Sequence, residues 1–145
     1  MTSRRRFLET TFAASLVASL AGAQDKKPRR IVLRSSWQTI NIGDIAHTPG
    51  VLALLEKHLP EVEVRLWPMN IGNGVDTMLA ERFPKVKIMQ GREDILAAFE
   101  ECDFLLHGSG PGFVARKDVA KWHEATGKPY GVYGIPYAAQ DKASE

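Results

Sequence analysis

Apolar residues follow two alternating spacings along this chain, from Ile31 to Ile135. Apolar runs of strand length are centred on 31–33, 62–66, 86–88, 104–106 and 132–135, and apolar residues at helical spacing mark 48–59, 75–83, 95–99 and 119–127. Strands that alternate with helices through short connections form parallel sheets covered on both faces. The pattern therefore predicts an α/β fold with a doubly wound, Rossmann-like parallel sheet of about five strands, ordered 3-2-1-4-5.

Local signals predict where the first and last helices of this pattern begin and end. Thr48 is a cap residue followed by Pro49, which is favoured at the first helical position. We therefore expect the first helix to begin there, after a loop from Ser35 to Ala46. The last helix is expected to stop at Gly127, where glycine commonly ends a helix.

The amino-terminal segment has the pattern of an export signal. Ser3-Arg4-Arg5-Arg6-Phe7-Leu8 matches the twin-arginine motif, an apolar stretch follows, and Ala21-Gly22-Ala23 is a cleavage site. The apolar stretch is shorter than the roughly 20 residues that span a bilayer, so we expect no stable membrane span. We predict a signal peptide at 1–23, recognised by the twin-arginine export machinery, and a periplasmic or otherwise exported protein. The alternatives are an uncleaved anchor and an unstructured basic tail.

The remaining chain is expected to hold one domain. We predict a linker at 24–30, the Rossmann-like domain at 31–137 and a polar tail at 138–145. The leader carries three arginines and one glutamate, so 16 of the 19 basic and 16 of the 17 acidic side chains remain after cleavage. This balance, with no basic stripe, argues against a nucleic-acid partner.

Two aromatic or sulfur-containing side chains have alternative roles. Cys102 is the single cysteine and cannot form a disulfide within the chain, so we expect it to be a buried packing residue rather than a nucleophile. Trp37 is expected either to stack on a ligand or to pack in the core.

Two unusual loops follow the first and fourth predicted strands, Ser35 to Asp44 and His107 to Gly112. In a sheet ordered 3-2-1-4-5 these strands are neighbours whose connections leave in opposite directions, so their carboxyl ends open a crevice. Glycine lets the backbone approach a ligand, and N–H groups beside a helix start suit a phosphate or carboxylate. The predicted ligand-binding residues are Asn41, Gly43, Asp44, Gly108, Ser109, Gly110 and Gly112.

Each of these features also has a purely structural interpretation. The glycine-rich segment suits a tight strand-to-helix turn, and Asn41 to Asp44 suits an Asx-type turn in which Asp44 bonds nearby backbone amides. His47 and His107 lie near the crevice without the spacing of a three-ligand metal site. We therefore expect the two histidines to be polar partners, and we expect no metal or other cofactor.

Three segments together resemble the polysaccharide pyruvyl transferase family. Asn41-Ile42-Gly43-Asp44 resembles the N-x-G-D signature of that family. Asp103 to Gly112 is similar to its acidic residue, apolar strand and glycine cluster. Pro129 to Pro136 is similar to its strand that ends in glycine, a small apolar residue and proline. The resemblance covers Ile31 to Pro136.

The resemblance implies a function and a missing partner domain. Members of this family transfer a pyruvyl group from phosphoenolpyruvate to a sugar as a ketal, in a two-domain glycosyltransferase-B-like fold with the active site between the domains. We therefore expect phosphoenolpyruvate or another anionic donor, and a sugar of an envelope glycan as acceptor. The second domain, which in this family supplies the proposed catalytic histidine and arginine groups, is not matched. The chain is accordingly expected to be truncated, and inactive alone.

The same sequence pattern bears on two other function classes. A non-catalytic periplasmic module that binds a ligand or partner with the same fold is the main alternative. A nicotinamide-dependent oxidoreductase is disfavoured, because the first strand is not followed by G-x-G-x-x-G.

Overall fold

The computed structural model describes residues 29–136, which form a five-stranded parallel sheet. The strands are β1 (Arg30–Ser35), β2 (Glu63–Pro68), β3 (Lys87–Ile88), β4 (Phe104–His107) and β5 (Tyr130–Val132). They lie in the order β3-β2-β1-β4-β5, and every neighbouring pair is parallel. The predicted α/β, Rossmann-like fold class and strand order are confirmed. The expected signal peptide, most of the linker and the polar tail lie outside the described residues.

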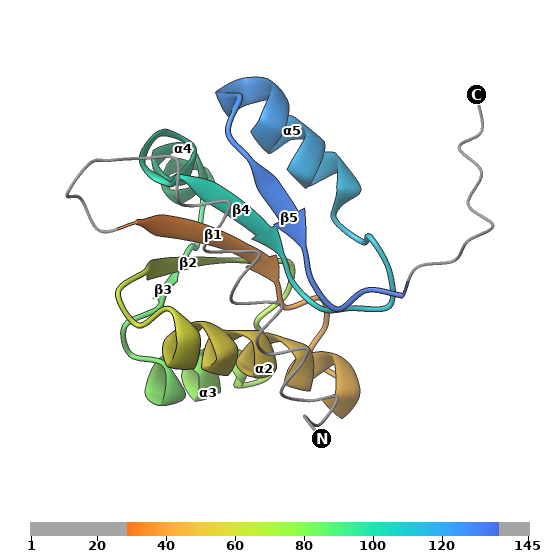
Figure 1. The fold of residues 1–145 in the computed structure, drawn as a ribbon. Coiled ribbons are helices and arrows are strands. Elements are labelled where there is room, and N and C mark those ends of the chain that lie inside the picture. The colour runs from red at the N-terminus through yellow and green to blue at the C-terminus, as the bar shows by residue number, and fades with distance from the viewer. Residues whose placement is uncertain (1–28, 137–145) are drawn as a thin grey trace, which may run out of the picture.

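Four helices cover the two faces of this sheet. They are α2 (Ile42–His58), α3 (Val75–Arg82), α4 (Arg92–Glu101) and α5 (Arg116–Thr126). Figure 1 shows α2 and α3 on one face and α4 and α5 on the other. Within residues 29–136, every helix is too short or too polar to cross a membrane.

The alternation of side chains along β1 explains why the molecule has two hydrophobic clusters. Ile31 and Leu33 pack into the cluster with α2 and α3, whereas Val32 packs into the cluster with α4 and α5. All three side chains are fully buried. A strand covered on both faces is expected to be a continuous apolar run, as this one is.

The predicted start of the first helix is wrong. α2 begins at Ile42, and Asn41 is its cap residue, with its side-chain oxygen accepting a hydrogen bond from the Gly43 N–H at 2.8 Å. Pro49 lies inside the helix despite the loss of a backbone hydrogen bond, which typically costs about 3 kcal/mol. Thr48 is buried within α2, where its hydroxyl contacts the end of β1. The local start signal was overridden by an earlier cap and by this tertiary contact.

The last predicted strand is shorter than expected. β5 ends at Val132, and Ile135 lies beyond it. Gly134 has φ +66°, a left-handed conformation that turns the chain out of the strand.

The connection from α5 to β5 is fixed by one lysine. Gly127 ends α5 in a left-handed conformation, and the adjacent Lys128 Nζ donates to the carbonyls of Phe99 and Glu100 at 2.7 Å and of Cys102 at 2.8 Å. These bonds satisfy carbonyls at the end of α4. Cys102 is fully buried, and burial raises its pKa to about 11. The prediction that Cys102 is a buried packing residue is confirmed.

Candidate functional site

The end of β1 is held against α2 by a set of hydroxyl groups. The Thr48 hydroxyl lies 2.8 Å from Ser35 Oγ and accepts a hydrogen bond from the Ser36 N–H at 2.9 Å. Ser36 has φ +60°, and its hydroxyl donates to the Asn70 carbonyl at 2.7 Å. The loop that follows β1 therefore leaves the strand through a fixed left-handed turn, bonded to both α2 and the loop after β2.

The predicted Asn41 to Asp44 segment opens α2 at this edge. Asn41 forms the Asx-type turn, so this structural interpretation holds, but with Asn41 rather than Asp44 accepting from the backbone. Asp44 instead accepts a hydrogen bond from the side-chain amide of Gln38. The Asp44 carboxylate is half-buried and sits in the first turn of α2, where the helix dipole favours a negative charge.

The glycines of the second loop differ in what surrounds them. A Cβ on Gly108 would lie 2.7 Å from Ser35 Oγ, and one on Gly110 would lie 2.5 Å from Trp37 Nε1. Both glycines are therefore needed, Gly108 because the end of β1 lies so close and Gly110 because Trp37 in the loop after β1 does. A Cβ on Gly112 would meet nothing within 4 Å, so its surroundings remain open.

Ser109 connects three segments that are far apart in the sequence. Its carbonyl accepts a hydrogen bond from Trp37 Nε1 at 2.7 Å, and its hydroxyl donates to the Gly134 carbonyl at 3.0 Å. The same hydroxyl lies 2.8 Å from His47 Nδ1, and the Gly110 N–H donates to Gly134 at 3.3 Å. We call the region around these contacts the loop junction. It consists of Trp37, Asn41 to His47, Gly108 to Gly112 and Gly134.

The contact between Ser109 and His47 leaves the other ring nitrogen of His47 without a partner among residues 29–136. The Ser109 hydroxyl lies 2.8 Å from His47 Nδ1 and 3.0 Å from the Gly134 carbonyl oxygen, and it can donate to either. When it donates to Gly134, Nδ1 donates to Ser109 Oγ and Nε2 keeps a lone pair. Nε2 makes no hydrogen bond to any residue between 29 and 136.

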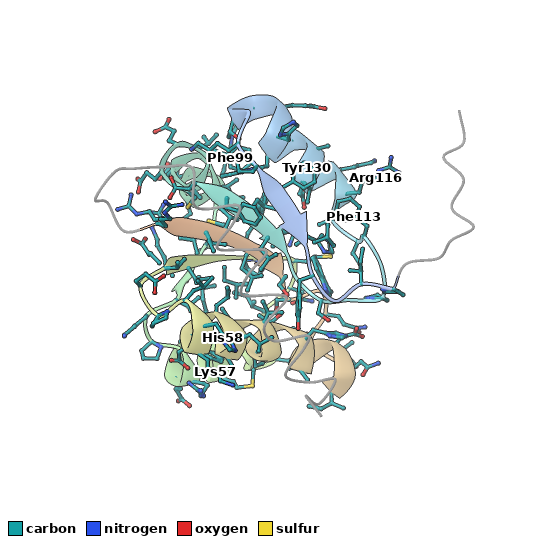
Figure 2. All side chains as sticks on the ribbon, in the orientation of Figure 1. Lys57, His58, Phe99, Phe113, Arg116 and Tyr130 are labelled. Atoms are coloured by element: carbon teal, nitrogen blue, oxygen red, sulfur yellow. The ribbon has the colours of Figure 1, made fainter. Side chains whose placement is uncertain are left out.

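A stack of planar side chains lies beneath the loop junction. Arg34 Cζ lies 5.1 Å from the Trp67 ring centre and 5.5 Å from that of Trp37, and Trp37 stacks on His107 at 4.7 Å. Phe113 meets His107 edge-on at 5.0 Å. Figure 2 shows Phe113 on the loop between β4 and α5. Trp37 is only 7% exposed, so it packs in the core. Core packing was one of the two roles expected for it, the other being stacking on a ligand.

His107 is the buried histidine of this stack. Its Nε2 accepts a hydrogen bond from the Ala115 N–H at 3.2 Å, and its Nδ1 has no hydrogen-bond partner. Burial lowers the pKa of His107, and the positive charge of Arg34 adds to this, while the backbone oxygens of Gly108 and His107 act in the opposite direction. The ring is therefore held neutral, and it supports Trp37 from below rather than reaching a ligand.

Arg34 is a buried cation on β1 with one carboxylate partner and one carbonyl partner. Its Nε donates to the Asp118 carboxylate at 2.8 Å, and a terminal nitrogen donates to the Trp67 carbonyl at 3.1 Å. The pair fixes the start of α5 against the sheet. A buried arginine needs such a partner, because an unpaired buried charge is strongly unfavourable.

Sequence reasoning placed the predicted residues correctly at one edge but missed their connections. Asn41, Gly43, Asp44, Gly108, Ser109, Gly110 and Gly112 all come to the loop junction through the start of α2 and the loop after β4. Direct bonding of His47 to Ser109 was missed, as was the stack that supports Trp37. The signal available for Trp37 was its position inside the loop after β1, at the predicted crevice. Within residues 29–136, no cluster of three or more His, Cys, Asp or Glu side chains could hold a metal ion.

A cavity of about 960 Å³ opens beside the loop junction. It lies between the loop after β2, the start of α3 and the start of α4, and Trp67 contributes to its wall. Sequence reasoning did not predict this cavity, which we call the cleft. The loop after β2 contains Gly72 and Gly74, but sequence reasoning assigned them no ligand.

Comparisons with known proteins add a fold-level similarity. No family model and no curated protein matches this chain. Among solved structures, the chain is similar to the E. coli heptosyltransferase WaaC with ADP-2-deoxy-2-fluoro heptose, at a TM-score of 0.47 and 15% identity over 83% of this chain. The chain spans 38% of the length of that transferase. At this level of similarity, only the residues of this chain can support a functional assignment.

Proposed function

We propose that the chain is the amino-terminal half of an exported, polysaccharide pyruvyl transferase-like protein with a two-domain, glycosyltransferase-B-like fold. The reaction is transfer of a pyruvyl group from phosphoenolpyruvate, or another anionic donor, to a sugar of an envelope glycan as a ketal. One observation carries the proposal. The second and third segments that resemble the family are bonded to each other through Ser109 and Gly134, and His47, one turn along α2 from the first segment, also contacts Ser109.

The chemistry of the proposed reaction needs a base for the acceptor hydroxyls. Two sugar hydroxyls form C–O bonds to the central carbon of the donor, and the bond from that carbon to the phosphate oxygen breaks. One hydroxyl proton ends on the methylene carbon, which becomes a methyl group, and the other leaves with phosphate. His47 Nε2, which keeps a lone pair when the Ser109 hydroxyl donates to Gly134, is the base that this chain offers.

Asp44 and the open part of the glycine loop have positioning roles in this proposal. The carboxylate of Asp44, fixed by Gln38, orients an acceptor hydroxyl. The backbone around Gly112 is open, so an anion can approach it next to the start of α5. Figure 2 shows Arg116 at that helix start.

The isolated chain is expected to bind but not to transfer. In the resembled family the reacting centre lies between two domains, and this chain supplies one wall of it. Positioning and electrostatic stabilisation of the transition state are then largely lost. A non-catalytic binding module with the same fold is the second candidate, and the cleft favours it, because a cavity of that size is complete within this domain.

Donor binding tests the proposal. Titration calorimetry of the chain with phosphoenolpyruvate is expected to show weak binding that Gly112→Val reduces by roughly fivefold or more, because the added side chain occupies the open approach. Thermal melting of Gly112→Val serves as the control and is expected to match the parent chain. Equal donor affinity in both proteins contradicts binding at this loop. Transfer of a labelled pyruvyl group to a sugar by the isolated chain would contradict the requirement for a second domain.

Acceptor orientation by Asp44 is tested separately. Asp44→Asn keeps the shape of the side chain and removes its charge, so it is expected to weaken sugar binding and leave the melting temperature nearly unchanged. Glu61→Gln, an exposed carboxylate at the other end of the sheet, is the matched control. A loss of about 0.5–2 kcal/mol of stability with unchanged titrations would make Asp44 a helix-start residue only.

A further inference from the structure

The cleft lies at the same edge of the sheet as the loop junction, on the side of β2 and β3. Its volume of about 960 Å³ is at the upper end of the roughly 300–1,000 Å³ typical of small-molecule sites. The starts of α3 and α4 form two of its walls, and the loop after β2 forms a third. The wall of the cleft contacts the loop after β1, which leads into the loop junction, because the Ser36 hydroxyl donates to the Asn70 carbonyl and Asn73 donates to Thr39.

The side chains that line the cleft have the chemistry of a site for a neutral polyhydroxy ligand. The charged, amide-bearing and aromatic members are Trp67, Asn70, Asp76, Glu81, Gln90 and Arg92. Two carboxylates oppose one guanidinium, so the lining has no excess of positive charge to hold a phosphate-bearing donor. Carboxylates accept hydrogen bonds from hydroxyl groups, and primary amides both accept from and donate to them, which is the recognition that sugars require.

Trp67 gives the cleft a rigid aromatic surface. Phe99 meets its ring edge-on at 5.8 Å, and Arg34 lies over the ring at 5.1 Å. These contacts fix the indole before any ligand arrives, which lowers the entropy lost on binding. The C–H groups of a pyranose pack favourably on such a ring, and the half-buried Trp67 remains accessible from the cleft.

Polar groups at the ends of the cleft remain available for a ligand. Asn70 uses its side-chain oxygen to accept from the Gly72 N–H at 3.1 Å, which leaves its amide nitrogen to donate. α4 begins at Arg92 without a side-chain cap from Gly91. The Arg92 guanidinium and the Gln90 side chain are exposed and make no hydrogen bond or ion pair within residues 29–136.

We propose that the cleft binds a neutral oligosaccharide segment of the glycan, so that the sugar to be modified reaches the loop junction. The proposal rests on the proposed function only in naming this glycan as the acceptor. Carbohydrate binding itself needs neither the donor nor a second domain.

Intrinsic fluorescence gives a direct test, because the three tryptophans differ in exposure. Trp122 is fully buried and Trp37 is 7% exposed, whereas Trp67 is half-buried and lines the cleft. Cellotetraose and chitotetraose are the probes. At least one is expected to change the tryptophan emission in a saturable way, and Trp67→Phe is expected to abolish that change.

Substitutions on the lining identify the binding surface. Asp76→Ala and Arg92→Ala each remove one polar partner and are expected to weaken tetrasaccharide binding roughly five- to tenfold. Glu124→Ala and Lys121→Ala, an exposed acid and base on α5, are matched controls and are expected to leave binding unchanged. Binding can be read by calorimetry for all four variants, so the test does not depend on the fluorescence signal.

Three outcomes would overturn the proposal. They are no binding of either tetrasaccharide, equal weakening by the α5 controls, and stronger occupation of the cleft by phosphoenolpyruvate or inorganic phosphate. Its failure is distinct from failure of the proposed function. Loss of donor binding at the loop junction, with sugar binding in the cleft retained, would reject pyruvyl transfer and leave a carbohydrate-binding module.

Discussion

The loop junction and the cleft lie at the same edge of one sheet, yet one is filled by the protein and the other is hollow. After β1, Trp37 lies between Arg34 and His107 and fills the space beneath the glycine loop. After β2, the chain turns away through exposed Met69 and Asn70, and a cavity of about 960 Å³ remains. The comparison shows that the position of a loop at a switch point does not decide where space for a ligand forms. The size of the side chains that fold back into the edge decides it.

The largest expected difference in stability is between substitutions at two glycines of the same loop. Gly110→Ala places a Cβ 2.5 Å from the indole of Trp37, which is too tightly packed to move, so we expect a loss of about 1–3 kcal/mol of stability. Gly112→Ala meets nothing within 4 Å and is expected to change stability by no more than about 0.5 kcal/mol. Urea unfolding of both proteins, followed by circular dichroism, measures the difference. Equal stabilities would mean that the junction is not filled as described.

A smaller difference in stability is expected between substitutions of one tryptophan from each region. Trp37→Phe removes the hydrogen bond from Nε1 to the Ser109 carbonyl, worth about 0.5–1.5 kcal/mol, while keeping an aromatic ring on His107. Trp67→Phe makes the same truncation in the cleft wall, where the indole nitrogen has no hydrogen bond within residues 29–136. Unfolding experiments are expected to show the greater loss for Trp37→Phe. The opposite ranking would contradict the hydrogen bond as the contact that holds the glycine loop.

The pH dependence of stability tests the role of His107, the buried histidine that stacks on Trp37. Burial lowers the pKa of His107 below its ordinary value near 6.5, so the unfolded chain binds a proton in a range where the folded chain does not. The contribution of His107 is therefore complete above about pH 6.5 and is lost as the pH falls through the lowered folded pKa. The free energy of unfolding, measured from about pH 8 to about pH 5, should depend less on pH in His107→Gln. The exposed control His123→Gln should keep the parent slope, and an equal change in both would exclude His107 as the cause.

The smallest expected effect belongs to the cleft. Arg92→Ala removes an exposed side chain with no hydrogen bond or ion pair to residues 29–136, so stability is expected to change by no more than about 0.5 kcal/mol. Differential scanning calorimetry measures this directly. A large loss of stability would mean that Arg92 stabilises the fold rather than being available to bind a ligand.

The sequence predicted the fold well because burial on both faces leaves a clear pattern. Ile31 to Leu33 and Phe104 to Leu106 are continuous apolar runs, and both became central strands. The first helix start was mispredicted, because Ile42 is 78% exposed and gives no apolar signal before Thr48. Cap chemistry at Asn41 and the tertiary bond of Thr48 to Ser35 decided the boundary instead.

The candidate site was predictable only in part. Glycines and the Asn41 to Asp44 segment are visible as local motifs, so their place at the sheet edge followed from strand order. The bond between His47 and Ser109 joins residues 62 positions apart, and no local pattern predicts it. The cleft is bounded by the loop after β2, where Gly72 and Gly74 indicate a turn but not a cavity.

Two-dimensional amide NMR of the chain, titrated separately with phosphoenolpyruvate and a tetrasaccharide, tests most directly whether donor and acceptor bind at different residues. Phosphoenolpyruvate is expected to shift the amide signals of Gly110, Gly112 and Gly134 at the loop junction. The tetrasaccharide is expected to shift those of Gly72 and Gly91 at the cleft. The predicted result is that Gly72 and Gly91 respond to the sugar alone and Gly112 to the donor alone, while Asp44, which is proposed to orient an acceptor hydroxyl, responds to the sugar. A single set shifted by both ligands, or no shift at the loop junction with the donor, would contradict this division of donor and acceptor binding.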